Sequence, residues 1–157
     1  MIAGQEKTSD QTSIISDPRL ASFQRYLSDK GIFQPDFVKV GNFSSESGYQ
    51  MMTELINEHK DQLPSAFFIS SDALAIGALR ALQEHGIQVP QDVSIISFND
   101  TSIAKYIYPS LSTVTVFTEE MGKQALHILD QSLASEEDSI PYMVKLSTKL
   151  TIRESSI

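Results

Sequence analysis

The amino-acid sequence predicts an α/β fold in which helices flank a parallel sheet. Residues 66–69 and 93–98 form short apolar runs without alternation, which is typical of strands covered on both faces. Between these runs, residues 73–85 carry apolar side chains at helical spacing. A strand, a helix and a second strand in this order predict a βαβ unit, whose crossover is expected to be right-handed.

Clear signals mark both ends of the helix in this unit. Ser70, Ser71 and Asp72 precede the helix and belong to the residue types that cap helix N-termini. Gly86 follows it and is typical of a helix C-terminus. Five apolar residues form the stripe that we expect to be buried: Leu74, Ala75, Ala78, Leu79 and Leu82.

The chain before this unit predicts a second unit of the same kind. Residues 1–4 resemble the end of a strand whose beginning is missing, and residues 5–16 read as a polar loop. Asp17 followed by Pro18 marks a helix start, and Gly31 marks the end of that helix. Its buried stripe is expected to consist of Leu20, Phe23 and Leu27.

A strand at residues 37–40 and a helix at residues 46–61 complete the second unit. Four residues of this helix are expected to face inward: Met51, Met52, Leu55 and Ile56. Beyond the central unit we expect five further elements in this order: a short helix at 103–108, a half-exposed strand at 112–116, a helix at 118–133, an acidic loop at 134–140, and a strand or hairpin at 142–153.

Composition narrows the class of protein. A chain of 157 residues with 41% hydrophobic content can build a sizeable core. Its net charge of −8 and lack of a basic cluster make it a poor binder of nucleic acid on its own. There is no cysteine, and no apolar run approaches the length of a membrane span or of a signal-peptide core. We therefore expect a cytoplasmic protein without membrane contact.

Several motifs follow one another along the chain. Residues 86–94 read Gly-Ile-Gln-Val-Pro-Gln-Asp-Val-Ser, and residues 97–100 read Ser-Phe-Asn-Asp. Residues 109–114 read Pro-Ser-Leu-Ser-Thr-Val, and residues 153–155 read Arg-Glu-Ser. Near the start, residues 19–23 read Arg-Leu-Ala-Ser-Phe, with Ser where Gly is usual. In this order the motifs resemble those of the LacI/GalR family of bacterial transcription regulators.

The resemblance implies a lobe of the type I periplasmic-binding-protein-like fold together with part of a second lobe. Residues 1–108 would form the effector-binding lobe, and residues 109–157 would form part of the second lobe with a strand that returns to the first. The implied function is the sugar-sensing and dimerisation region of a repressor, with a saccharide in the crevice between the lobes. In the family, operator DNA is contacted by an N-terminal helix-turn-helix, which nothing in this chain resembles.

Polar residues directly follow each predicted strand, and in an open parallel sheet such loops meet where ligands bind. Arg19 lies in the first turn of its helix, where a cation opposes the helix dipole, so we expect it to reach toward a ligand or an acidic partner. A salt bridge with Asp17 or Glu6 is the alternative. Phe43 can stack on a sugar ring or pack as a lid over the strand ends.

The resemblance assigns sugar contacts to Arg19, Phe43, Ser71 and Asn99. Ser71 stands where Asn is common in the family, and Asn99 stands where Asp is common. Both keep their hydrogen-bonding capacity, which suggests an altered choice of sugar, although helix capping alone explains Ser71 equally well. Residues 98–101 resemble those of regulators of galactoside or maltose utilisation, so a galactoside or a maltose-like saccharide is the expected effector.

No pattern in the chain points to catalysis. His59, His85 and His127 are isolated on predicted helices, and there is no glycine-rich phosphate loop. Asp72 and Asp100 could imitate an acid pair, but each is expected to cap the helix that follows it. We therefore expect neither an enzyme nor a metal site nor a cofactor.

An apolar surface is also expected. Ile76 lies off the buried stripe of its helix and, with Ile103, Tyr106, Ile107 and Tyr108, could form a patch. In the family the corresponding helices make the dimer contact. The resemblance thus implies a homodimer or a higher homo-oligomer, with Ile76, Ile107 and Tyr108 in its interface.

Two other functions fit the same fold. A solute-binding protein of a sugar ABC transporter shares the two lobes and the crevice, but the motifs at residues 109–114 and 153–155 favour the regulator. A sugar-active enzyme lacks support because the chain shows no nucleophile or metal constellation.

Overall fold

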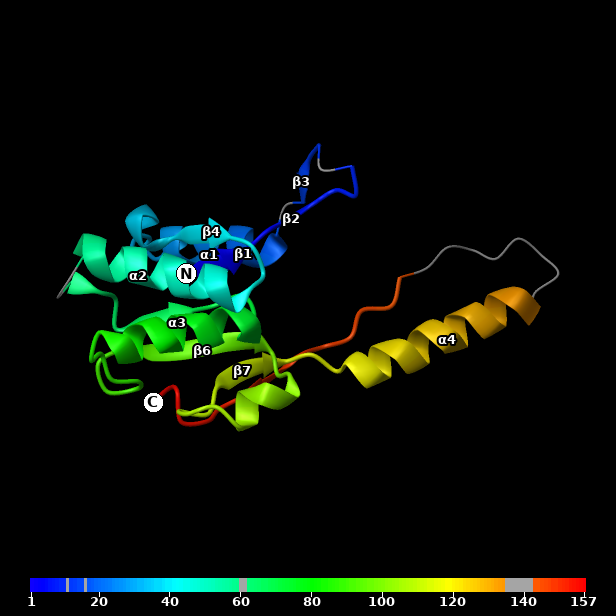
Figure 1. Ribbon diagram of the computed structural model, residues 1–157. Helices are drawn as coiled ribbons and strands as arrows, with labels where there is room; N and C mark the ends of the chain where they lie inside the picture. Colours follow the sequence, from blue (N-terminus) through cyan, green and yellow to red (C-terminus); the bar gives the residue numbers. More distant parts are fainter. Residues whose placement is uncertain (11, 16, 60–61, 135–142) are drawn as a thin grey trace.

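The computed structural model contains a sheet of mostly parallel strands with helices on both faces (Figure 1). It describes residues 1–10, 12–15, 17–59, 62–134 and 143–157. Four strands pair in the order β5-β6-β7-β8, and only β8 is antiparallel to its neighbour. Their bounds are Ala66–Phe68 for β5, Ser94–Asn99 for β6, Ser112–Thr115 for β7 and Lys149–Thr151 for β8.

Two further strands extend this sheet. Strand β1 (Ile2–Gly4) pairs in parallel with β4 (Lys39–Gly41). On its other side, Ile2 forms a parallel bridge with Ile69, and the Ser70 amide donates a 2.9 Å hydrogen bond to the Ile2 carbonyl. The resulting order is β4-β1-β5-β6-β7-β8, which confirms the prediction of a parallel sheet flanked by helices.

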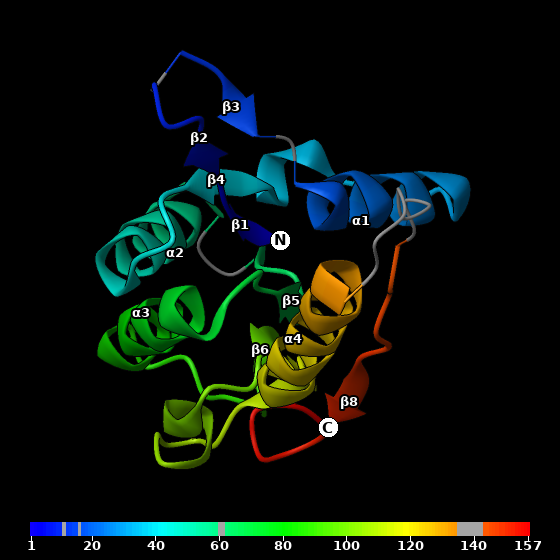
Figure 2. The ribbon, with the colours of Figure 1, turned by 90° about the vertical axis from the view of Figure 1, so that its right-hand side faces the viewer.

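Helices α2 (Ser45–His59) and α3 (Asp72–Glu84) cover one face of the sheet, and α1 (Pro18–Asp29) lies on the other (Figure 2). The inward-facing residues predicted for α2 and α3 are all buried. Two glycines let these helices approach closely. A Cβ atom on Gly77 would overlap the Ser45 carbonyl oxygen, and one on Gly48 would overlap the backbone of Leu74.

Helix α1 begins as predicted, but it is less buried than expected. Asp17 caps it by accepting a hydrogen bond from the Arg19 amide, and Pro18 is its first residue. The predicted stripe of Leu20, Phe23 and Leu27 is only half-buried, and no residue of α1 is fully buried. Phe23 contacts Phe68 with ring centroids 6.3 Å apart, which is the distance of an aromatic pair.

A β-hairpin replaces the polar loop expected at residues 5–16. Strand β2 (Glu6–Lys7) pairs antiparallel with β3 (Ile14–Ile15). Asp10 organises the turn by accepting hydrogen bonds from the Thr8 hydroxyl and from the amide and hydroxyl of Thr12. These bonds lower the pKa of Asp10 to about 2.

The remaining elements differ from expectation in three places. The strand expected at residues 37–40 starts two residues later, after a 3₁₀ helix at Pro35–Phe37. The short helix expected at residues 103–108 is a 3₁₀ helix at Ser102–Lys105. Of the strand or hairpin expected at residues 142–153, only β8 forms among the described residues. Most of the expected acidic loop falls in residues 135–142, which lie outside the described residues.

Helix α4 (Thr118–Ala134) projects away from the sheet (Figure 1), and none of its residues is buried. Strand β7, which we expected in the second lobe, instead pairs with β6 inside the sheet. Within the described part of the chain, no helix has the length and apolar character needed to cross a membrane.

Candidate functional site

A cleft of about 460 Å³ lies at the carboxyl ends of the strands. All four residues predicted to bind the ligand line it, namely Arg19, Phe43, Ser71 and Asn99. They come from α1, the loop after β4, the start of α3 and the end of β6. The structure therefore brings together residues that are up to 80 positions apart, because parallel strands end at one edge of the sheet.

Arg19 lies at the centre of this cleft. Its guanidinium carbon lies 4.8 Å from the centroid of the Phe98 ring and 5.6 Å from that of the Phe43 ring. One terminal nitrogen donates a 2.8 Å hydrogen bond to the Ser70 carbonyl, and Nε donates a 2.9 Å bond to Asp17. The guanidinium group of Arg19 thus lies near two aromatic rings. The quadrupoles of these rings attract its positive charge.

The salt bridge considered as an alternative role for Arg19 is present. The second terminal nitrogen of Arg19 lies 2.9 Å from the Asp17 carboxylate. Burial alone would raise the pKa of Asp17, but the hydrogen bonds and charge of Arg19 outweigh it and hold this pKa below its ordinary value. Asp17 therefore stays ionised and orients the guanidinium, while Arg19 still reaches the cleft.

Phe43 forms a wall of the cleft. Its half-buried ring lies against the end of β1, where a Cβ atom on Gly4 would overlap it. Gly4 is therefore required for the ring to take this position. The ring packs against the core and also lines the cleft, a position that fits both roles considered for it.

Ser71 is buried and caps α3. Its hydroxyl oxygen accepts a 3.3 Å hydrogen bond from the Leu74 amide. The neighbouring Ser70 hydroxyl accepts a 2.9 Å bond from the Gly4 amide and so ties α3 to β1. Capping, the alternative explanation of Ser71, is therefore present in the structure.

Asn99 ends β6 in an unusual backbone conformation. Its φ angle is 110°, and that of Asp100 is 59°, both in the region that L-residues rarely adopt. Backbone strain of this kind persists where the surroundings hold it, and it is common at functional sites. Here the next residue, Thr101, is anchored by a 2.6 Å bond from its amide to the Asp72 carboxylate.

Asp72 is a buried structural hub that sequence analysis placed wrongly. It does not cap α3, since Ser71 does. Its carboxylate accepts hydrogen bonds from Ser97 on β6, Thr113 on β7 and the Thr101 hydroxyl. Polar residues inside the apolar strands at 97 and 113 were the available signal, because buried hydroxyl groups need a partner.

Asp100 was also misassigned as a helix cap. No side-chain cap is found at the 3₁₀ helix that follows it. Instead Asp100 accepts a 2.7 Å hydrogen bond from Arg153 and a 2.8 Å bond from Thr115. Burial would raise its pKa, but these bonds and the charge of Arg153 hold the pKa below the ordinary value.

Sequence analysis missed other residues that line the cleft. Glu6 reaches it from the hairpin, and Thr101 and Ile103 reach it from the loop after β6. Thr101 follows a predicted strand and so had a positional signal. Glu6 follows the strand end predicted at residues 1–4 and had the same signal, although the hairpin that carries it was expected to be a polar loop.

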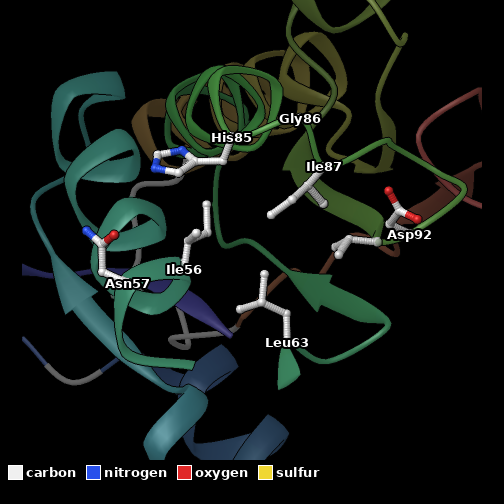
Figure 3. A pocket seen from close by; sticks show the side chains of 8 residues that line it. Ile56, Asn57, Leu63, His85, Gly86, Ile87 and Asp92 are labelled. Atoms are coloured by element: carbon white, nitrogen blue, oxygen red, sulfur yellow. The ribbon is translucent and has the colours of Figure 1, made fainter. Parts of the chain in front are cut away.

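A second cavity, of about 520 Å³, lies at the opposite ends of the strands, beside the C-termini of α2 and α3. Figure 3 shows Ile56, Leu63 and Ile87 converging on it. Two of its polar groups are already engaged, since His85 Nδ1 lies 2.8 Å from the Ala81 carbonyl and Asp92 accepts a bond from the Gln88 amide. This leaves the cleft around Arg19 as the better ligand site.

Among the described residues, no three His, Cys, Asp or Glu side chains gather in a way that could hold a metal ion. The histidines do not approach the cleft either. His59 contacts Phe37 with ring centroids 4.3 Å apart, and His85 ends α3.

The residues predicted for a dimer interface are distributed over different surroundings. Ile76 lines the cleft together with Ile103, and Ile107 packs against the core. Tyr108 is 82% exposed, as is Tyr106. The expected patch thus reduces to two tyrosine rings, with Ile76 beside the ligand site.

The comparisons with known proteins agree with the observed fold. Residues 1–156 match the family described as periplasmic binding protein-like domain. The chain is 54% identical over 156 residues to the HTH-type transcriptional regulator GalR of Streptococcus thermophilus. The matched region covers 99% of this chain and 46% of that protein. It is 42% identical over 160 residues to the HTH-type transcriptional repressor MelR of Bacillus subtilis, covering 98% of this chain and 44% of the repressor.

Solved structures of similar proteins give the same result. The transcription regulator CcpA of Lactococcus lactis superposes with a TM-score of 0.79 at 28% identity, over 99% of this chain and 54% of that one. The regulator CelR in complex with cellobiose gives 0.79 at 29% identity, over 98% and 46%. The chain thus spans about half the length of these relatives. None of these named relatives is described as an enzyme, in agreement with the prediction that this chain is not one.

Motifs, fold and relatives all agree. The chain therefore belongs to the family of periplasmic binding protein-like domains, in the form found in transcription regulators of the LacI/GalR type.

Proposed function

We propose that this chain is the sugar-sensing region of a transcriptional repressor and that a saccharide binds in the cleft around Arg19. The observation that carries the proposal is the convergence of Arg19, Phe43, Ser71 and Asn99 on one cleft. Its volume of about 460 Å³ falls in the range of small-molecule sites.

The chemistry of these side chains suits a sugar. Sugar hydroxyls both donate and accept hydrogen bonds, while the C–H faces of the ring are apolar. Arg19 supplies fixed donors, Asn99 supplies a donor and an acceptor, and Phe43 supplies a flat apolar surface. The CelR regulator, 29% identical, was solved with cellobiose, which supports a saccharide as the class of ligand.

We place the ligand between two lobes. Residues 1–108 supply most of the first lobe, and the segment from 109 to 157 adds strands β7 and β8 to the sheet of that lobe and contributes α4 to the second. Helix α4 supports this division because it leaves the sheet with exposed apolar side chains, among them Met121, Leu126, Leu129 and Leu133. Side chains of this size are normally covered by another layer of the fold.

DNA binding is assigned to a helix-turn-helix outside this chain. The chain has a net charge of −8, and phosphate contacts require basic groups. The relatives named HTH-type regulators are about twice as long as this chain. A repressor must reach its operator, so we place the protein in the cytoplasm.

The protein is proposed to act as a homodimer. The exposed rings of Tyr106 and Tyr108 are the expected contact, and the resemblance to the family adds the half-buried Ile76 and Ile107. Light scattering should show a dimer for the parent and a monomer for Tyr108→Ser. The variant Tyr26→Ser removes an equally large ring, 62% exposed on α1, and should remain dimeric. A parent that stays monomeric at tens of micromolar would contradict this assignment.

The function is tested in a hybrid regulator, in which this chain replaces the matching 156 residues of the Streptococcus thermophilus relative. A galactoside or a maltose-like sugar is expected to release the hybrid from that relative's operator in a gel-shift assay. The unmodified relative is the positive control. Release by no saccharide in a panel of galactosides and maltooligosaccharides, by a hybrid that folds and binds DNA, would refute the proposal.

A solute-binding protein is the second candidate, since it has the same fold and crevice. The relatives named above favour the regulator, because each is described as a regulator or repressor of transcription.

A further inference from the structure

The ligand cleft continues into a smaller recess on the hairpin side. This recess has a volume of about 190 Å³ and is lined partly by Gly4, Gln5 and Pro18. It shares Glu6, Arg19 and Phe43 with the main cleft. The two spaces therefore adjoin, and the side chains of Glu6, Arg19 and Phe43 line both. The recess is below the usual size of an independent small-molecule site, so it reads as an extension of the cleft.

One face of the hairpin forms the outer wall of the recess. In the register of β2 and β3, Glu6 lies opposite Ile15, and Lys7 lies opposite Ile14. Directly opposed residues of an antiparallel pair share one face, and their neighbours point to the other. In agreement, Glu6 and Ile15 line the recess, whereas Lys7 and Ile14 do not.

The wall carries chemistry that suits a sugar. Glu6 is exposed, and no described side chain pairs with its carboxylate. It can therefore accept hydrogen bonds from hydroxyl groups. Ile15 is 49% exposed and offers an apolar contact beside the Phe43 ring. This arrangement repeats the combination of polar group and flat apolar surface found in the main cleft.

Hydrogen bonds join the base of the hairpin to the sheet and join its two arms to each other at the tip. The Gln5 amide donates a 2.8 Å hydrogen bond to the Gly41 carbonyl at the end of β4. At the tip, the Thr8 amide bonds to the Ser13 carbonyl at 2.8 Å, and the Ser13 amide bonds to the Thr8 hydroxyl at 3.1 Å. A wall fixed in this way can position Glu6 without ordering a loop when the ligand binds.

We propose that the recess is a second sugar subsite, so that the effector is a di- or oligosaccharide whose further unit lies between Phe43 and the Glu6–Ile15 face of the hairpin. The proposal rests on the proposed function, since it assigns the first unit to the cleft around Arg19. Ile15 is then a specificity-determining residue, because it lines the recess and not the main cleft, whereas Glu6 lines both and is placed to contact both units.

The test uses the hybrid regulator and isothermal titration calorimetry. The probes are galactose and glucose against the disaccharides melibiose, lactose and maltose. At least one disaccharide should bind the parent about tenfold or more tighter than its single units, as expected for one added hydrogen bond to a charged group. Ile15→Ser should remove most of this preference and leave the affinity for the single sugar unchanged, whereas Glu6→Gln should weaken binding of disaccharides more than binding of single sugars, because Glu6 lines both spaces.

Matched controls lie on the opposite face of the same hairpin. Lys7→Gln and Ile14→Ser change the same strands and should leave both affinities as in the parent. If they reduce the preference equally, the hairpin acts through its folding and the subsite assignment is wrong. Thermal unfolding of each variant shows whether it folds like the parent.

The outcomes separate the subsite from the proposed function. A preference for disaccharides that survives Glu6→Gln and Ile15→Ser would overturn the subsite and leave the sugar-sensing function intact. Equal loss of single-sugar affinity in Ile15→Ser would also overturn it, because Ile15 would then belong to the first subsite. Binding of no saccharide at all by a folded parent would instead refute the proposed function.

Discussion

Arg153 near the C-terminus and Asp100 at the end of β6 form an ion pair in which a guanidinium nitrogen lies 2.7 Å from the carboxylate. The side chains of both residues are largely shielded, with 15% and 9% exposed. A second guanidinium nitrogen donates a 2.7 Å bond to the Leu111 carbonyl. The pair thus holds the end of the chain against the strained turn that presents Asn99 to the cleft.

Breaking this pair should weaken the fold. Arg153→Ala leaves the Asp100 carboxylate without its charged partner, and we expect the free energy of unfolding to fall by about 1–3 kcal/mol. Urea denaturation of Arg153→Ala, Asp100→Asn and the double variant measures the coupling between the two residues. Additive effects of the two changes would show that the pair contributes nothing of its own.

The N-terminal amino group makes the stability of the 157-residue chain depend on pH. The Met1 amino group is buried and donates a 2.7 Å hydrogen bond to the Phe37 carbonyl. Burial lowers its pKa from 8.0 to about 5 in the folded state. Between these two values the unfolded chain binds more protons than the folded chain, so stability should rise from pH 5 to pH 8, by at most about 1.4 kcal/mol per pH unit.

The measurement is urea denaturation at intervals across this range. A chain whose amino group has been acetylated no longer carries this titration, so its stability should vary less between pH 5 and pH 8. The same slope in the acetylated and the free chain would assign the dependence to other groups, the histidines first.

The close approach of α2 and α3 predicts a large difference between two glycine substitutions. Gly77→Ala forces a methyl group onto the Ser45 carbonyl, so the helices must separate, and we expect a loss of about 1–3 kcal/mol in the free energy of unfolding. Gly122→Ala on α4 meets no neighbouring atom and should stabilise its helix by up to about 1 kcal/mol. Thermal unfolding of both variants checks the prediction, and equal effects would contradict it.

The sheet and the helices could be predicted from the sequence because their signals are local. The strand at residues 66–69 is a continuous apolar run, the strand at 93–98 is mostly apolar, and α3 has both a capping residue and a terminal glycine. The hairpin was not predicted because it lacks such local signals. Its strands are two residues each, and its turn of Thr, Ser and Asp residues has the composition of an irregular loop.

The candidate site could be predicted only in part. Strand ends identified where Asn99 and Ser71 would lie, because the carboxyl ends of parallel strands meet. The partners of Asp72 and Asp100 lie 15 to 53 residues away along the chain, so local pattern could not reveal them. For an aspartate before a helix, the local pattern suggests capping of that helix. This prediction was wrong for both Asp72 and Asp100.

The contacts of Arg19 test the central claim most directly. In the hybrid regulator, calorimetry should show that Arg19→Ala and Asn99→Ala each weaken binding of the effector sugar by about 1–3 kcal/mol, the range for lost hydrogen bonds to buried polar groups. Arg25→Ala removes an exposed arginine from the same helix and should bind like the parent. Unchanged affinity in both Arg19→Ala and Asn99→Ala, with the parent binding sugar, would contradict the assignment of the sugar to this cleft.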